Sequence, residues 1–219
     1  MTTDILYSFR RCPYAIRVRW ALLICEIKVE IREVDLKNKP IEFMNKSSTK
    51  TVPILLKKNN EVIEESLDII IWALSESVIE DIKNFYIPKS KENAILKIIS
   101  ENDHGFKYHL DRFKYSARFN PSEESYHFLE ATKFIKKWNK ILQDSRWLFG
   151  DKPSIADWCI WPFVRQFKIA CETQKKTNYF DDPIKIWLEY FEKHHYFKKL
   201  MHKYDPWGPS SKKDYFPYI

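Results

Sequence analysis

The chain has 219 residues, a net charge of +7, 44% hydrophobic residues and 16% aromatic residues. These values are typical of a folded globular protein with one large domain or two modest ones. A mean hydropathy of −0.49 and the lack of an apolar run of about 18 residues exclude a membrane-spanning helix.

The positive charge does not by itself indicate nucleic-acid binding. The lysines alternate with acidic residues, as in "SKENAILK" and "YFEKHHYFKK", which is typical of solvated helix faces. We therefore expect no nucleic-acid partner and no membrane partner, whereas a small anionic substrate would benefit from the charge. The start "MTTDILYSF" lacks a basic segment followed by an apolar one, so we expect a cytoplasmic protein.

Glycine is too rare for a nucleotide-binding loop. The three glycines, Gly105, Gly150 and Gly208, are far apart. Phosphate-binding loops need closely spaced glycines, so most nucleotide-dependent enzymes are excluded.

The first part of the chain alternates between strand and helix patterns. Strands are expected at 4–9 and 29–36, a hairpin at 51–65, and helices at 13–26 and 66–76. This order predicts a small mixed sheet with helices on both faces, over residues 1–77.

Beyond this part the pattern is helical. Residues 78–89 contain a proline and interrupt the periodicity, so we interpret them as a linker. Amphipathic or apolar helices are expected at 91–113, 121–142, 154–171 and 183–195. The fold class predicted is an α/β domain followed by an all-helical domain, residues 90–219.

One cysteine has an unusual setting. Cys25, Cys159 and Cys171 lie among apolar residues and are expected in the core, whereas Cys12 lies in "SFRRCPYA". Pro13 is favoured at the first position of a helix, so Cys12 is predicted to be the N-cap. There a thiolate would accept hydrogen bonds from the amides of Tyr14 and Ala15.

Whether Cys12 would form a thiolate depends on how the free energy needed compares with what the helix start supplies. Making an ordinary cysteine mostly ionised at pH 7 needs its pKa to fall by about 2.5 units, or roughly 3.4 kcal/mol. The helix dipole supplies about 0.3–2 kcal/mol and one charged hydrogen bond about 1.5–3 kcal/mol. Together they suffice, with Arg10, Arg11 or Arg17 as helpers. Ala15 leaves no second thiol nearby, so an external thiol is required.

Two further stretches could bind that thiol compound. Pro53, before a strand, indicates either a sheet edge or a cis turn that exposes the backbone of Val52 to a peptide ligand. "EESLD" begins a helix at Ser66, whose amides and hydroxyl form a site suited to a carboxylate.

These motifs resemble those of the glutathione transferases, closest to the omega-like branch that uses cysteine. "YSFRRCPYA", "DLKNKP", "TVPIL", "EES" and "SIADWCIWPF" follow that family's order over nearly the whole chain. The resemblance implies a thioredoxin-like N-terminal domain, a helical C-terminal domain, glutathione as co-substrate, no metal, and a homodimer.

The resemblance also implies roles for individual residues. Cys12 would form a mixed disulfide with glutathione. The glutathione-binding residues would be Tyr14, Leu36, Lys39, Val52, Pro53, Glu65 and Ser66. One departure is Lys50, which stands where the family usually has a glycine, and this affects the loop before Val52.

In the helical domain the sequence indicates a structural motif and a less defined pocket. Ser154 and Asp157 have capping-box spacing, typical of a structural helix start. An acceptor pocket between the domains is expected to involve Tyr108, Tyr115, Trp161 and Arg165. The six histidines show no metal-binding or catalytic spacing.

Three functions are consistent with these features. The first is thiol–disulfide exchange through a Cys12–glutathione disulfide, including dehydroascorbate-type reduction and removal of glutathionyl groups. The second is conjugation of glutathione to a small electrophile, with Tyr7 or Ser8 as the activating hydroxyl. The third is a binding module that retains the fold without turnover.

Overall fold

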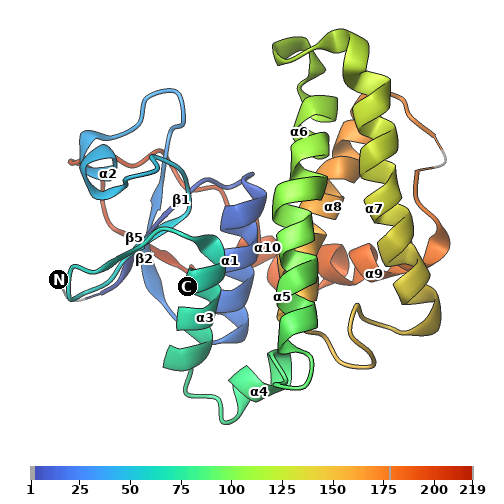
Figure 1. The fold of residues 1–219 in the computed structure, drawn as a ribbon. Helices are drawn as coiled ribbons and strands as arrows, with labels where there is room; N and C mark the ends of the chain where they lie inside the picture. The colour runs from blue at the N-terminus through green and yellow to red at the C-terminus, as the bar shows by residue number, and fades with distance from the viewer. Residues whose placement is uncertain (1–2, 178, 219) are drawn as a thin grey trace. The chain divides into compact units, whose positions relative to one another are not determined.

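The computed structural model describes residues 3–177 and 179–218, and it divides the chain into two compact units. The first unit combines Met1–Lys83 with His195–Ile219, and the second unit is Asn84–His194. Figure 1 follows the chain through both, from blue to red.

The first unit contains a five-stranded mixed sheet in the order β4-β3-β1-β2-β5. Its strands are β1 (Ile5–Ser8), β2 (Val29–Glu33), β3 (Ile54–Leu56), β4 (Val62–Ile63) and β5 (Asp214–Phe216). The pair β1–β2 is parallel and aligns Tyr7 with Arg32, whereas the other three pairs are antiparallel. This mixed sheet with helices on its faces is the predicted thioredoxin-like fold.

Helices cover both faces of this sheet. They are α1 (Pro13–Ile24), α2 (Ile41–Lys46), α3 (Ser66–Glu76) and α10 (Tyr196–Leu200). Phe43 of α2 packs with Ile5, Tyr7 and Ile54 on one face. Because side chains alternate along a strand, Leu6 faces the other side, where α1 and α3 lie next to each other (Figure 1).

The end of the chain returns to the first unit, which the prediction of a helical domain over 90–219 did not include. Strand β5 pairs with β2, with Tyr215 opposite Glu30, and Phe216 is fully buried. The Trp207 amide donates to the carbonyl of Glu33 at 2.8 Å. A three-residue strand has too little periodicity to be recognised locally, because pairing with β2 is what defines it.

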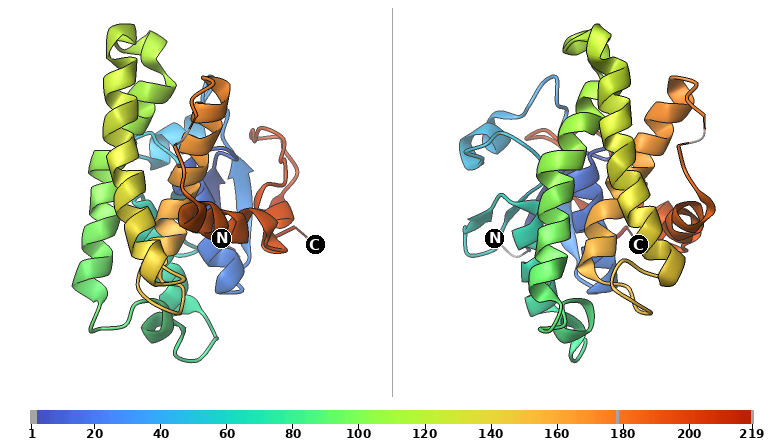
Figure 2. Two further views of the ribbon diagram at one scale, coloured as in Figure 1. Left: turned by 90° about the vertical axis from the view of Figure 1, so that its right-hand side faces the viewer. Right: turned by 45° about the vertical axis from the view of Figure 1, so that its right-hand side comes forward.

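The second unit is helical, as predicted. Its elements are α5 (Glu92–Ser100), a π-helical segment (Glu101–Phe106), α6 (Lys107–Lys114), two short turns (Ser116–Arg118 and Pro121–Glu123), α7 (Glu124–Asp144), α8 (Ile155–Thr173) and α9 (Asp182–Lys193). The short α4 (Ile82–Tyr86) spans the boundary between the units, inside the segment interpreted as a linker. Figure 2 shows α6 and α7 packed along each other.

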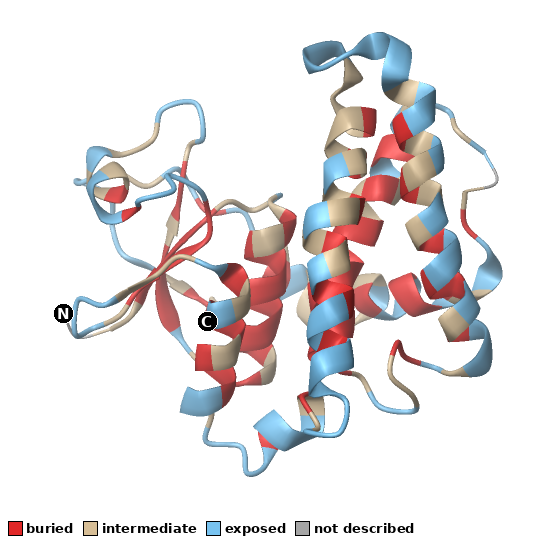
Figure 3. Ribbon diagram, viewed as in Figure 1, coloured by how far each residue is buried: buried red, intermediate tan, exposed pale blue. Residues whose placement is uncertain are grey.

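Helix α8 is the centre of the second unit, as its apolar sequence predicted. Every residue from Ile155 to Val164 is buried, and Figure 3 shows this burial by colour. The carboxylate of Asp157 accepts hydrogen bonds from the amide and hydroxyl of Ser154 at 2.8 and 2.9 Å. The capping box is therefore confirmed.

Candidate functional site

Cys12 is the N-cap of α1, as predicted, and Pro13 is the first helical residue. It is the one cysteine of the four that is not buried. Its side chain makes no capping hydrogen bond in this structure, and the predicted contact of a thiolate with the amides of Tyr14 and Ala15 stays a prediction. The thiol instead donates to the Val52 carbonyl at 3.5 Å, because a protonated sulfur has a proton to give.

The other three thiols lie in apolar surroundings. Burial raises the pKa of both Cys25 and Cys171 to about 12. Cys159 is also fully buried. Their expected role in the core agrees with this burial, and Cys12 is left as the candidate nucleophile.

The Val52–Pro53 peptide bond is cis, the second of the two arrangements that the sequence left open. Val52 is buried, and its carbonyl lies beside the Cys12 thiol. The Val52 carbonyl is therefore a backbone polar group next to the candidate nucleophile.

Ser66 is the first residue of α3, next to the exposed N-cap Glu65. Its hydroxyl is buried and accepts two hydrogen bonds from the Arg17 guanidinium, at 3.1 Å from Nε and 2.7 Å from Nη2. Since both oxygen lone pairs are occupied, the hydroxyl proton is the part of Ser66 that can bind a ligand oxygen. Arg17 thus makes Ser66 a donor suited to a carboxylate.

Sequence reasoning assigned Arg17 to the thiol, whereas the structure places it at Ser66. The two residues are 49 positions apart, so the contact depends on the packing of α1 against α3. The buried arginine in an apolar helix was the available signal, since such a charge needs a polar partner.

The remaining predicted glutathione-binding residues lie around the same part of the first unit. Tyr14 is half-buried beneath the Arg17 guanidinium, which lies 4.8 Å from its ring. Leu36 is 43% exposed, and the Lys39 ammonium donates to the Lys50 carbonyl at 2.8 Å.

Lys50 adopts the conformation that a glycine would favour. Its φ is +55°, in the left-handed region. Its amide donates to Ser47 Oγ at 2.7 Å, and its carbonyl accepts from Lys39. The loop before Val52 therefore has a glycine-like turn even though a lysine occupies it.

The residues expected in the acceptor pocket all belong to the second unit. Trp161 is buried and stacks on Phe191 with ring centres 5.0 Å apart, and Arg165 lies 3.3 Å from Glu192. Tyr108 is exposed beneath Arg112, and Tyr115 follows α6. Their role as acceptor contacts stays a prediction.

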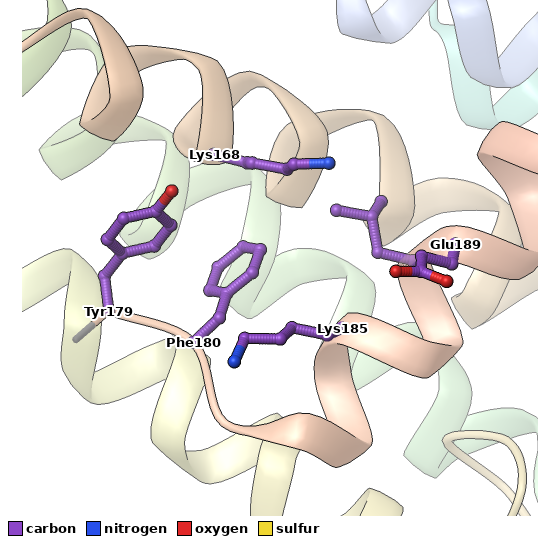
Figure 4. Close-up of a pocket in the computed structure, with 6 residues that line it drawn as sticks. Lys168, Tyr179, Phe180, Lys185 and Glu189 are labelled. Carbon is purple, nitrogen blue, oxygen red and sulfur yellow. The ribbon is translucent and has the colours of Figure 1, made fainter. Parts of the chain in front are cut away.

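Two surface hollows lie in the described part of the second unit, and none of those four residues lines either of them. One, of about 290 Å³, is lined by Lys168, Tyr179, Phe180, Lys185, Leu188 and Glu189 (Figure 4). The other, of about 380 Å³, is lined by Leu142, Ser145, Arg146, Trp147, Pro183, Ile186, Trp187 and Tyr190.

The charges of the first hollow are satisfied within the protein. Lys168 pairs with Glu192 at 2.9 Å, and Lys185 pairs with Asp182 at 3.2 Å. Glu189 accepts from Lys193 at 2.5 Å. The hollow therefore shows no unmatched charge that would select a ligand.

Residues 3–177 and 179–218 contain no group of three or more histidine, cysteine or acidic residues arranged to bind a metal ion. None of the helices there combines the length and apolar character needed to cross a bilayer.

Comparison with known proteins identifies the family. The model described as "Glutathione S-transferase, N-terminal domain" matches residues 6–77, and that described as "Glutathione S-transferase, C-terminal domain" matches residues 128–207. The chain belongs to the glutathione S-transferase family and is a glutathione transferase on that basis.

Its relatives include omega-class proteins. Glutathione S-transferase omega-1 from Mus musculus is 28% identical over 183 residues, which cover 84% of this chain and 74% of that protein. Glutathione S-transferase omega-2 from Rattus norvegicus is 39% identical over 62 residues, 28% of this chain and 25% of that protein.

Solved structures share the fold. Glutathione transferase Omega 3C from Trametes versicolor has a TM-score of 0.77 at 15% identity, covering 94% of this chain and 92% of that one. A family member from Pseudomonas fluorescens pf-5, solved with two glutathione bound, has a TM-score of 0.75 at 18% identity, covering 91% and 92%.

Proposed function

We propose that the protein catalyses glutathione-dependent thiol–disulfide exchange through Cys12. The observation that carries this proposal is the partly exposed Cys12 thiol at the start of α1, beside the Val52 carbonyl that precedes a cis proline. A cysteine at a helix start is a position where a thiolate is stabilised.

Ionisation would change the hydrogen-bond partner of the Cys12 sulfur. While protonated, the sulfur donates to the Val52 carbonyl. Once the proton is lost, the sulfur can only accept, and the carbonyl oxygen repels it. The thiolate then turns toward the positive end of α1, where amide groups can donate to it.

The reaction proceeds through two exchanges. The Cys12 thiolate attacks the glutathionyl sulfur of a mixed disulfide, forms a Cys12–glutathione disulfide, and releases the other thiol as its thiolate, which takes up a proton. A second glutathione thiolate attacks the glutathionyl sulfur. This step yields glutathione disulfide and regenerates the Cys12 thiolate. Dehydroascorbate-type reduction instead consumes two glutathione thiols, which become glutathione disulfide, and transfers their two electrons and two protons to the acceptor.

Residues of the first unit would hold the glutathione. The Val52 backbone would pair with its cysteinyl part, next to Pro53. Ser66, oriented by Arg17, would donate to a carboxylate at the γ-glutamyl end, beside Glu65. Tyr14, Leu36 and Lys39 would complete the site.

The hydroxyls that conjugation would use belong to buried side chains, with Tyr7 1% exposed and Ser8 0% exposed. Tyr7 Oη accepts from Arg32 at 2.6 Å, and burial raises the Tyr7 pKa. Ser8 is fully buried and accepts from Arg19 at 2.6 Å. Both observations favour Cys12 over a hydroxyl as the functional group.

A substitution at the sulfur tests the proposal. Cys12→Ala should reduce turnover of a glutathionyl mixed disulfide by on the order of 10³-fold, as expected for loss of a nucleophile. Turnover of an aryl halide serves as the comparison. Undiminished disulfide exchange in Cys12→Ala contradicts the proposal. Retention on immobilised glutathione without activity in either assay would indicate a binding module.

The cellular setting and the assembly are also proposals. Cytoplasmic action would give the enzyme the reduced glutathione that it consumes. A homodimer is expected from the family, and sedimentation velocity measures it directly.

A further inference from the structure

A buried pair of opposite charges lies on either side of the turn that leads into Cys12. Arg19, on α1, is 1% exposed, and Glu33, at the end of β2, is 8% exposed. Charged residues are seldom buried to this extent unless they have polar partners. The hydrogen-bond partners of Arg19 and Glu33 indicate what these two buried charges do.

The turn itself spans Phe9 to Cys12. It is closed by a hydrogen bond from the Cys12 amide to the Phe9 carbonyl at 3.0 Å. Within it, the Arg10 amide donates to Glu33 Oε1 at 2.7 Å, and the Arg10 carbonyl accepts from Arg19 Nη2 at 2.7 Å. Both polar backbone groups of Arg10 are therefore held by buried charges.

Both charged residues are anchored to the rest of the first unit. Arg19 follows Cys12 by two helical turns, so both lie on one face of α1, and helical side chains lean toward the N-terminus. The Arg19 guanidinium also donates to Ser8 Oγ at 2.6 Å. The Glu33 carbonyl accepts from the Trp207 amide, so the returning tail supports that side.

The electrostatics fit this arrangement. Burial lowers the pKa of Arg19 to about 10, which leaves its guanidinium charged at neutral pH. The negative charges of Glu33 and of an ionised Cys12 oppose that lowering, so Arg19 in turn favours the Cys12 thiolate. Burial raises the pKa of Glu33, and the Arg10 amide and Arg19 act against that rise.

We propose that Arg19 and Glu33 are positioning residues for Cys12. They hold Arg10 from both sides, fix the turn from Phe9 to Cys12, and so place the sulfur at the start of α1. The inference rests on the proposed thiol chemistry. The inference adds two residues to that chemistry, Arg19 and Glu33, which touch neither glutathione nor an acceptor.

The test measures the rate of Cys12 alkylation by iodoacetamide between pH 5 and 10, without glutathione, by mass spectrometry of the Cys12 peptide. Arg19→Met should move the midpoint of the pH profile upward by about one unit and slow alkylation at pH 6.5 by about 10-fold. Arg32→Met is the matched control, because it removes a partly buried guanidinium from the same unit, where it pairs with Glu30 at 2.8 Å and donates to Tyr7 Oη at 2.6 Å. It should leave the pH profile unchanged.

A second pair of variants isolates the Glu33 contact. Glu33→Leu removes the acceptor for the Arg10 amide and should slow alkylation at neutral pH several-fold, whereas Glu33→Gln retains an acceptor oxygen and should restore the rate. This pair decides the question even where Arg19→Met does not fold, which circular dichroism would show.

The outcomes separate the two proposals. A wild-type midpoint equal to that of free cysteine overturns the proposed function. A low wild-type midpoint that persists in Arg19→Met, or equal rates for Glu33→Leu and Glu33→Gln, overturns the positioning role alone.

Discussion

Helices α1 and α8 begin in different ways, one in each unit. At the start of α8, Asp157 is fully buried and accepts four hydrogen bonds, from the Leu148 amide at 3.0 Å, Trp187 Nε1 at 2.9 Å, and the amide and hydroxyl of Ser154. At the start of α1, the Cys12 side chain makes no capping bond.

The difference separates a residue that stabilises the fold, Asp157, from a candidate catalytic residue, Cys12. A carboxylate that already accepts four bonds has no capacity left for a ligand, and its value is stability. A thiol that makes no capping hydrogen bond can accept one from the helix amides once it has ionised to a thiolate. The turn before α1 is held instead by Arg19 and Glu33, through the carbonyl and the amide of Arg10.

Replacing Cys12 by a residue that caps α1 should separate stability from activity more than any other change. Cys12→Ser supplies a preferred capping oxygen and should stabilise the first unit by about 0.5–1 kcal/mol, yet disulfide exchange should fall by on the order of 10³-fold. Urea denaturation and the exchange assay measure the two effects. A fall in both stability and activity would mean that the thiol contributes to the fold.

Removing the Asp157 carboxylate at the start of α8 should have the opposite effect, a loss of stability without a loss of activity. Asp157→Ala leaves four donors unsatisfied and should lower the free energy of unfolding by about 3 kcal/mol or more, with activity per folded molecule preserved. The exposed Asp151 is a matched control, since Asp151→Ala should stay within about 0.5 kcal/mol. Equal losses for both variants would contradict the assigned support role.

Helix α3 extends the comparison to a third start, which also lacks a side-chain cap. Ser66→Ala should weaken glutathione binding by about 10-fold, as expected for one hydrogen bond to a charged group. Titration calorimetry in a Cys12→Ser background avoids exchange chemistry. Ser75, whose hydroxyl donates to Trp72 within the same helix, provides the control Ser75→Ala, which should bind as well as its parent.

The loop before Val52 should show the smallest effect. Lys50→Gly relieves a left-handed lysine and should change stability by no more than about 1 kcal/mol, in the stabilising direction. Lys46→Gly, in α2, should instead cost about 1 kcal/mol. Chemical denaturation of both variants checks the sign, and a loss at Lys50 would show that its side chain is needed.

Much of this arrangement could be predicted from short motifs. Cys12 before Pro13, Val52 before Pro53, and the spacing of Ser154 and Asp157 each specify local geometry, and the structure has these features. Local signals suffice because a cap or a turn is formed by neighbours in the chain.

The partners of buried charges could not be predicted in this way. Arg17 meets Ser66 across 49 positions, and Glu33 meets Arg10 across 23. An arginine in an apolar helix signals that it needs a partner but does not identify it. The same limit concealed β5, whose three residues become a strand only by pairing with β2.

The returning tail also affects how the protein is made. The edge of β2 is covered by residues 214–216, which a ribosome synthesises only after the whole second unit. Until then the nascent first unit exposes an unpaired strand edge, the kind of surface through which growing chains associate wrongly. Chaperone demand during translation should therefore be greatest for this part of the molecule, although most of it is made before the second unit.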